Sequence, residues 1–226
     1  MQDWVIAPWE AALLAEVGPL LLGEASGHDL AHCLRVRNLA GRIAQVEGGD
    51  RAALTAAAYL HDLFRDDPAN ADKTRAADFA VAILARTGFP DPPSAIVRAC
   101  ILYHSWSGRH RLAPAVLPPE VYIFRDADRL DALGAWGIAR VFAYGGEKGR
   151  PSGFDVLRAG WPDLDPAAPT GGLHSSPVSS IGHFHDKLLL LHDHMHTATG
   201  RALAAARHAY LAAFLARLEA EMAGLE

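Results

Sequence analysis

A buried helix that ends in two titratable side chains is the feature that most constrains how this chain can fold. Between Leu54 and His61, in the stretch LTAAAYLH, apolar residues recur at the i, i+3, i+4 spacing of one helix face, and the histidine occupies i+7. His61 is therefore expected to face the core, and Asp62 follows one step round the helix. Because a buried charge without a partner costs several kcal/mol, we expect this pair to be hydrogen-bonded to neighbours or to hold a metal.

The same helical period recurs along most of the chain. Half of the residues are apolar, and Ala and Leu dominate them, whereas β-branched and aromatic residues are sparse. This usage favours helix over strand, and the sequence predicts an all-α fold. The expected helices cover about residues 8–22, 26–46, 50–64, 71–87, 93–104, 119–144, 181–197 and 200–222.

One long segment, residues 145–180, lacks this period and is rich in Gly, Pro and Ser. We expect a long ordered loop or flap there, and in a compact domain such loops often serve function. A chain of 226 residues has the length of one domain. The predicted organisation is a single domain of residues 1–226, with a core at about 27–140, the loop at 145–180 and C-terminal helices at 181–222.

The composition argues against several kinds of partner. A net charge of −5 gives no electrostatic basis for binding nucleic acid or an anionic membrane surface. No stretch approaches the roughly 20 apolar residues of a membrane span, and the first residues do not resemble a signal peptide. Cys33 and Cys100 stand in apolar helical contexts, as expected of free core thiols in a reducing compartment. We therefore expect a cytoplasmic protein without a nucleic-acid or membrane partner, and a homodimer is compatible with these features.

Two further segments place candidate metal ligands on other helices. In HDLAHCLRVRNLA, His32 precedes an apolar helix face that includes Val36 and Leu39. In FRDADRLDAL, Asp128 lies four and seven residues after Phe124 and Val121, so it too should face the core. Together with the pair at the end of the earlier helix, two imidazoles and two carboxylates from three helices form a candidate metal site. Such mixed nitrogen and oxygen ligands favour Mn, Fe, Co, Ni or Zn over Ca.

Other titratable clusters do not require a metal. Asp126 and Asp131 are expected on the surface of the helix, in a row of alternating charges (a surface ladder) in which Arg125 and Arg129 neutralise them. The segment HDHMH, residues 192–196, spaces two histidines at i, i+4, but no third ligand accompanies them, so we predict no metal site there.

The motifs together are similar to those of a known family. The stretches HCLRV, AAYLHDL and DADRLDALGAWGIARVFAYGG resemble the HD-domain metal-dependent phosphohydrolases, whose ligands come in the order H…HD…D. With GHDLAH and HFHDKLLLL, they resemble one branch of small stand-alone bacterial HD proteins, whose members hydrolyse nucleoside triphosphates with a divalent metal such as manganese. The resemblance covers about residues 27–206.

This resemblance implies an HD-domain helical bundle that holds one divalent ion, with Mn preferred over Mg, Fe, Co, Ni or Zn. The implied ligands are His32, His61, Asp62 and Asp128. Asp128 is chosen over Asp126 because the last aspartate of the family usually follows Ala and precedes Arg or Lys. The ion would lower the pKa of a bound water and polarise a phosphoryl oxygen.

The implied reaction is cleavage of nucleoside triphosphates to the monophosphate and pyrophosphate. Asp62 would hold the metal and share the nucleophilic water, and Asp66, at the end of the same helix, would transfer protons. The candidate substrate-binding side chains are Arg35, Arg65, Lys73, His104, Arg129 and Lys187. Arg35 has an alternative role as an ion-pair partner that supports the ligands, and His28 would support the ligands or contact the substrate.

Three alternatives stay open at the level of sequence. A nucleoside monophosphatase differs only in which phosphorus faces the water. A di-iron oxygenase on the same fold requires extra histidines between His61 and Asp128, which His104 and His110 would supply. A non-catalytic HD module would bind a nucleotide without turnover.

Overall fold

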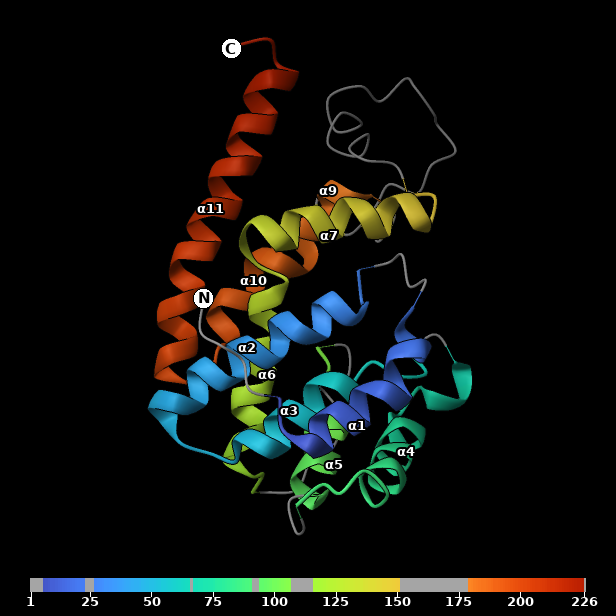
Figure 1. The fold of residues 1–226 in the computed structure, drawn as a ribbon. Coiled ribbons are helices and arrows are strands. Elements are labelled where there is room, and N and C mark those ends of the chain that lie inside the picture. The colour runs from blue at the N-terminus through green and yellow to red at the C-terminus, as the bar shows by residue number, and fades with distance from the viewer. Residues whose placement is uncertain are drawn as a thin grey trace. The chain divides into compact units, whose positions relative to one another are not determined.

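The computed structural model describes residues 6–22, 27–65, 67–90, 94–106, 116–150 and 179–225. Within these ranges every regular element is a helix, which confirms the all-α prediction (Figure 1). The chain divides into two compact units. The first contains the described residues among 1–24, 28–128 and 196–200, and the second contains those among 25–27, 129–195 and 201–226. The single domain expected for the whole chain stays a prediction.

The first unit is built around a central pair of helices. Its elements are α1 (Pro8–Val17), the 3-10 turn Gly18–Leu21, α2 (Leu30–Glu47), α3 (Arg51–Leu60), the 3-10 turn Pro68–Asn70, α4 (Thr74–Leu84), α5 (Ser94–Tyr103) and the first part of α6 (Pro119–Asp131). α2 packs against α3, α3 packs against α5, and α5 packs against α4, as can be followed in Figure 1. The apolar faces predicted for α2 and α3 are buried, including Val36, Leu39 and Leu54.

Two aspartates begin the helices that carry the candidate ligands. Asp29 caps α2, because its carboxylate accepts a hydrogen bond from the backbone N–H of His32 at 2.9 Å. Asp50 caps α3 in the same way through the N–H of Ala53, also at 2.9 Å. Such caps satisfy amide groups that have no partner within the helix, and each typically stabilises by about 1 kcal/mol. α2 therefore begins later than the sequence predicted, directly after Asp29.

A buried charged group fastens α1 to α2 and α3. Glu10 is 4% exposed, and its carboxylate accepts hydrogen bonds from the Tyr59 hydroxyl at 2.8 Å and from Arg37 Nη2 at 3.1 Å. The carboxylate is therefore paired within the core, as a buried charge must be. Burial and the bond to Glu10 raise the pKa of Tyr59, which keeps its hydroxyl protonated as the donor.

The second unit has an aromatic core. Its elements are the end of α6, α7 (Gly134–Glu147), α9 (Ser180–His183), the π-helical segment Phe184–Leu188, α10 (Leu189–Leu191), the 3-10 turn His192–His194 and most of α11 (Ala198–Met222). α7 packs against α9. Phe184 stacks on Phe214 of α11 with ring centroids 5.9 Å apart, and Phe142 of α7 lies 6.2 Å from Phe214.

One histidine of the second unit is held neutral by its surroundings. Burial lowers the pKa of His183 to about 4, and the positive charges of Lys187 and Arg150 act in the same direction. The folded protein therefore keeps this imidazole uncharged at pH values where an exposed histidine begins to take up a proton.

The single helix predicted for residues 119–144 is wrong, since the structure has two helices there. α6 ends at Asp131 and α7 begins at Gly134, whose φ of +72° is readily adopted only by glycine. α7 then continues to Glu147, so the first residues of the predicted loop are helical. Residues 151–178, the main part of that loop, lie outside the described residues.

The surface ladder predicted for Asp126 and Asp131 is also wrong, because both side chains are buried. Asp126 accepts hydrogen bonds from the backbone N–H groups of His196 and Thr197, at 2.9 and 2.7 Å, and from the Thr197 hydroxyl at 2.8 Å. These bonds attach α6 to the segment that leads into α11. A Cβ atom at Gly200 would overlap the Asp126 carboxylate, which explains the glycine at that position.

The remaining members of the expected ladder also have internal partners. Asp131 pairs with Arg140, whose Nη1 donates to Oδ2 at 2.7 Å. Arg129 donates from Nη1 to the carbonyl oxygen of His194, and Arg125 donates from Nε to the last carbonyl oxygen of α5 at 2.6 Å. Arg125 and Arg129 therefore bond to backbone oxygens and do not neutralise the two acids.

The two cysteines are free thiols in the core, as predicted. Cys33 lies on α2 and Cys100 on α5. Burial raises the pKa of both thiols, so they stay protonated and weakly reactive. None of the helices in the described ranges is both long and apolar enough to cross a lipid bilayer.

Candidate active site

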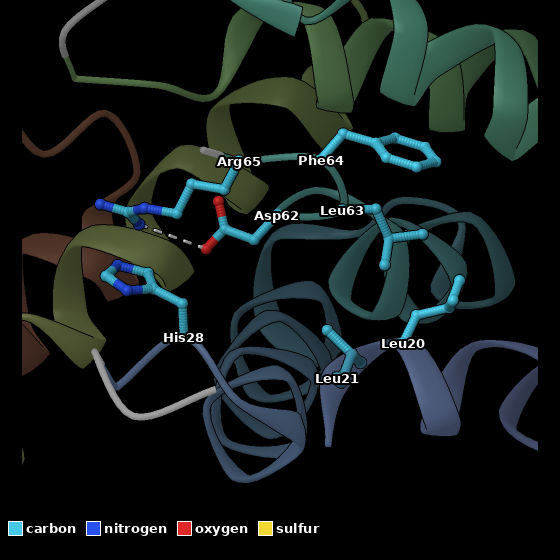
Figure 2. Close-up of a pocket in the computed structure, with 7 residues that line it drawn as sticks. All are labelled: Leu20, Leu21, His28, Asp62, Leu63, Phe64 and Arg65. Atoms are coloured by element: carbon cyan, nitrogen blue, oxygen red, sulfur yellow. Dashed lines mark ion pairs between the residues drawn. The ribbon is translucent and has the colours of Figure 1, made fainter. Parts of the chain in front are cut away.

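The turn that follows α3 positions the candidate site. His61 is the C-cap of α3, and residues 61–65 continue as turns. Figure 2 shows the carboxylate of Asp62 and the side chain of Arg65 on one side of this turn and the ring of Phe64 on the other. The backbone of Phe64 has a φ of +57°, a left-handed conformation that is unfavourable for an aromatic residue.

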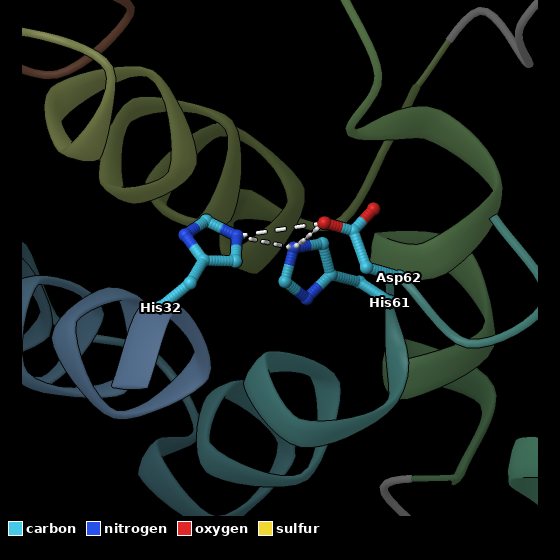
Figure 3. A group of neighbouring side chains, drawn as sticks. All are labelled: His32, His61 and Asp62. Atoms are coloured by element: carbon cyan, nitrogen blue, oxygen red, sulfur yellow. Dashed lines mark hydrogen bonds and ion pairs between the residues drawn. The ribbon is translucent and has the colours of Figure 1, made fainter. Parts of the chain in front are cut away.

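The first unit brings together His32, His61 and Asp62. The Nε2 atoms of the two histidines lie 3.2 Å apart. Oδ2 of Asp62 lies 3.5 Å from Nε2 of His32 and 3.3 Å from Nε2 of His61. Figure 3 shows the three side chains converging from α2 and from the end of α3. Both histidines are fully buried.

This geometry fits one divalent ion. His61 Nδ1 lies 3.0 Å from the carbonyl oxygen of Ala58, which can only accept, so Nδ1 carries the proton and Nε2 keeps its lone pair. Metal–nitrogen bonds of about 2.1 Å, at octahedral or tetrahedral angles, separate two ligand nitrogens by about 3.0–3.4 Å. The measured 3.2 Å between the imidazoles of His32 and His61 matches that separation. The residues present therefore fit the metal that the donor set suggests.

A fourth candidate ligand, Asp128, approaches from α6. Its Oδ1 lies 3.7 Å from His32 Nε2 and 3.8 Å from His61 Nε2, and its side chain is 25% exposed. All four residues predicted as ligands therefore lie in one place, although they come from three separate helices. The partial exposure of Asp128 leaves this side of the group open to a small molecule.

The two carboxyl groups are ionised despite their burial. Burial alone would raise the pKa of Asp62, but the imidazoles of His61 and His32, which lie 3.3 and 3.5 Å from Oδ2, favour its ionised form and hold the pKa well below its usual value. For Asp128, the effect of burial is again outweighed by the neighbouring imidazoles, first among them His61, and the pKa is lowered. Ionised carboxylates are what a metal site requires.

Two predicted phosphate-binding cations lie beside Asp62. Lys73 Nζ is 3.8 Å from Oδ1, and its side chain is 13% exposed. Arg65 Nη1 is 3.7 Å from Oδ2, and its side chain is 34% exposed. The site therefore presents positive charge next to the candidate metal group, where phosphate oxygens would need it.

A buried asparagine that the sequence did not reveal holds this turn in place. Asn70 is 1% exposed. Its Nδ2 donates to the carbonyl oxygens of Leu63 and Phe64 at 3.2 and 3.1 Å, and its Oδ1 accepts from the N–H of Ala76 at 2.9 Å. Asn70 thereby ties the turn after Asp62 to the first turn of α4. The signal available in the sequence was weak, because an Asn two residues after a Pro usually indicates only a turn.

His104 adds a neutral imidazole at the edge of the group. It is 3% exposed, its Nδ1 donates to the carbonyl oxygen of Ile101 at 2.9 Å, and its ring centroid lies 5.0 Å from that of His61. Burial, followed by the nearby imidazole of His61, lowers the pKa of His104 to about 4. At neutral pH its ring is therefore uncharged.

Five other predicted site residues have no role assigned by this geometry. Arg35 lies on α2 and is half-buried. Arg129 and Lys187 belong to the second unit. Asp66 and His110 lie outside the described residues. The functional roles of these five residues stay predictions.

The histidine-rich segment 192–196 does not form a comparable group. His192 Nδ1 pairs with Asp193 at 3.0 Å, and its ring lies 4.9 Å from that of His208. Within the described ranges, three ligand atoms converge at His32, His61 and Asp62 and not in this segment.

A pocket adjoins Asp62. Its volume is about 240 Å³, and its lining residues are Leu20, Leu21, His28, Asp62, Leu63, Phe64 and Arg65. Figure 2 shows His28, Asp62 and Arg65 at one end and the three leucines with Phe64 at the other. The ring of His28 stands edge-on to that of His32, with centroids 5.4 Å apart, so the polar end of the pocket continues into the candidate metal group.

Comparison with known families agrees with this geometry. The model of the HD domain family matches residues 29–133, a range that contains all four candidate ligands. The chain is 35% identical to the uncharacterized protein YpgQ of Bacillus subtilis (strain 168) over 211 residues, which cover 93% of this chain and 92% of YpgQ.

Solved structures show the same likeness. The crystal structure of YpgQ in complex with ADP is 30% identical, covers 94% of both chains and has a TM-score of 0.65. A Lactobacillus plantarum protein is 30% identical over 97% of this chain and 100% of its own, with a TM-score of 0.72. An HD-superfamily hydrolase from Bacillus thuringiensis is 32% identical over 95% of this chain and 96% of its own, with a TM-score of 0.61.

Proposed function

Because the chain belongs to the HD-domain superfamily and is a metal-dependent phosphohydrolase, we propose that it cleaves nucleoside triphosphates to the nucleoside monophosphate and pyrophosphate. The observation that carries this proposal is the group of His32, His61, Asp62 and Asp128, with Arg65 and Lys73 beside it. The complex of the relative YpgQ with ADP supports a nucleotide as the substrate.

In this proposal the four converging side chains hold one divalent ion, with manganese as the preferred metal. Two imidazole nitrogens and two carboxylates are a donor set that would hold a first-row divalent ion, and such an ion would also bind water and a phosphoryl oxygen. A bound divalent ion supplies Lewis-acid polarisation of the phosphoryl group and lowers the pKa of water.

The remaining chemistry falls to side chains around that group. Lys73 and Arg65 each lie within 4 Å of the Asp62 carboxylate, so a phosphate that approaches this carboxylate meets both cations. They therefore bind the phosphate oxygens and offset the negative charge that the reaction places there. Asp62, ionised and fixed at the end of α3, orients the attacking water, and Asp66 is our candidate for proton transfer.

His104 has a binding role in this proposal. Its ring is neutral, since burial lowers its pKa to about 4, and Nδ1 donates to a backbone carbonyl. Nε2 is therefore the ring atom available to the substrate or to a bound water, and it acts as an acceptor. Arg35, Arg129 and Lys187 stay secondary candidates for contact with the phosphates.

Turnover by metal-stripped protein resupplied with manganese tests the proposal. A panel of nucleoside tri-, di- and monophosphates is assayed separately for pyrophosphate and orthophosphate release, with Asp62→Ala beside the wild type. Asp78→Ala is the matched control, because Asp78 is an exposed acid, 62% accessible, paired only with Arg98 among the interactions described for its side chain. Pyrophosphate release that disappears in Asp62→Ala and persists in Asp78→Ala supports the proposal.

The other outcomes separate the alternatives. Orthophosphate release from monophosphates points to a nucleoside monophosphatase. Two ions per chain, measured on the wild type by elemental analysis, point to the di-iron oxygenase. Nucleotide binding without turnover of any nucleotide, in protein that retains its metal, refutes the proposed reaction and leaves a binding module.

A further inference from the structure

The pocket beside Asp62 has two chemically different ends. At one end stand His28, Arg65 and the carboxylate of Asp62. At the other, Leu20, Leu21, Leu63 and Phe64 present hydrocarbon (Figure 2). A ligand that fills this pocket therefore needs an anionic or metal-binding part joined to an apolar part.

The polar end is the part of the pocket that meets phosphate. Arg65 Nη1 lies 3.7 Å from Asp62 Oδ2, the same oxygen that faces both candidate imidazole ligands. His28 lines the same end of the pocket, and its ring stands edge-on to that of His32 with centroids 5.4 Å apart, so it lies beside the candidate metal group. The candidate metal group and Arg65 thus fix where the phosphate end of a ligand lies.

The apolar end is preorganised by its own packing. Phe64 stands edge-on to Phe79, with ring centroids 5.2 Å apart, and the guanidinium of Arg75 lies 4.4 Å from the ring centroid of Phe64. The side-chain amide of Asn70 donates a hydrogen bond to the backbone carbonyl oxygen of Phe64 and so holds this part of the turn. Leu63 is 3% exposed, whereas Leu20 on the facing 3-10 turn is 55% exposed. Leu63 and Phe64 therefore form a fixed wall, and Leu20 is an accessible side chain at the rim.

We propose that the apolar end binds the base of the nucleotide whose phosphates occupy the polar end. This inference rests on the proposed function and assigns the residues that hold the organic part of its substrate. A volume of about 240 Å³ is smaller than the roughly 300–1,000 Å³ that encloses a whole ligand. The pocket therefore encloses one part of the nucleotide and leaves the rest exposed. A flat base has two apolar faces that fit leucine side chains, whereas a pyrophosphate ion has none.

Binding of ADP and of inorganic pyrophosphate, measured by calorimetry at matched manganese concentrations, tests this assignment. Both ligands carry a diphosphate, and only ADP carries a base. Leu20 is the residue to change, because its exposure keeps the substitution compatible with the fold. We expect Leu20→Ala and Leu20→Asn to lower the ratio of ADP affinity to pyrophosphate affinity by about 5–10-fold, as loss of part of an apolar contact does.

Leu22→Ala is the matched control, since Leu22 is 75% exposed and does not line the pocket. A ratio that falls in both Leu20 variants and is unchanged in Leu22→Ala supports the assignment. A ratio that stays at the wild-type value in the Leu20 variants overturns it, as does a wild-type protein that binds ADP no more tightly than pyrophosphate. Because binding requires no bond cleavage, these results are independent of whether the protein hydrolyses triphosphates.

Discussion

Replacing Asn70 with alanine should loosen the turn that carries Asp62 and Arg65. The asparagine side chain bonds to two carbonyl oxygens after α3 and to one N–H at the start of α4. It therefore closes a loop that contains Phe64 and Lys73, two residues in left-handed backbone conformations. Such conformations are unfavourable by about 1–3 kcal/mol each and persist only where the surroundings hold them.

The size of the effect follows from the groups left without partners. In Asn70→Ala the carbonyl of Leu63 and the N–H of Ala76 lose the partner that Asn70 supplied, whereas the carbonyl of Phe64 keeps a bond from the N–H of Asp67 at 3.2 Å. Each unsatisfied buried group costs about 1–3 kcal/mol. Relaxation of the left-handed residues offsets part of this, which leaves a net loss of about 2–4 kcal/mol. For a chain of this length that corresponds to a decrease of roughly 4–16 °C in Tm.

The assay combines thermal unfolding with manganese affinity. Tyr59→Phe is the matched control, because it removes one buried hydrogen bond in the same unit but away from the turn. We expect Asn70→Ala to lower Tm and also to weaken manganese binding, whereas Tyr59→Phe lowers Tm and leaves manganese binding unchanged. A Tm within about 1 °C of wild type, with wild-type manganese affinity, would show that the three hydrogen bonds of Asn70 do not hold the turn.

Three further outcomes follow from other parts of the structure. Glu10→Gln removes the buried negative charge that pairs with Arg37, so the free energy of unfolding should fall by about 3 kcal/mol, measured by urea denaturation. Gly137→Ala places a Cβ atom against a backbone carbonyl and should destabilise by about 1–3 kcal/mol; Gly146→Ala, with open space around it, should be neutral or slightly stabilising. The folded-state pKa of His183, about 4, is below its unfolded value. As the pH falls from about 6.5 toward 4, the unfolded state takes up a proton that the buried imidazole does not. The free energy of unfolding therefore falls over this range, by about 1–3 kcal/mol in total. In His183→Asn the decrease in Tm between pH 6.5 and 4 should be smaller than in the wild type, and an identical decrease would contradict this reasoning.

The parts of the fold that the sequence predicted correctly are those that local spacing determines. The inward faces of α2 and α3 follow from a 3.6-residue period, which any stretch of helix must satisfy. His61 follows the buried residues of α3 for the same reason. The convergence of His32, His61, Asp62 and Asp128 was expected from that period together with the resemblance to HD-domain proteins. Neither source alone specifies that the two imidazole nitrogens lie 3.2 Å apart.

The predictions that failed depended on contacts between residues far apart in the chain. Asp126 resembled a surface acid because Arg125 is its neighbour, yet its partners His196 and Thr197 lie about seventy residues later. Asn70 resembled an ordinary turn residue, because its bonds to Leu63 and Phe64 and to Ala76 of α4 exist only in the folded chain. The break before Gly134 was missed because the apolar spacing continues across it, and a glycine within a helical pattern does not by itself predict a positive φ.

The attachment of Asp126 to residues 196 and 197 also determines when, during synthesis, the first unit can be completed. The four candidate ligands have all been translated once Asp128 has left the ribosome, but the groups that satisfy the Asp126 carboxylate are added only about seventy residues later. Until then a nascent chain carries a core acid without its partners, two residues before a candidate ligand. A fragment that ends shortly after α6 keeps every candidate ligand and lacks the partners of Asp126. The unit that holds the candidate ligands is thus completed by residues made about seventy positions after the last of those ligands.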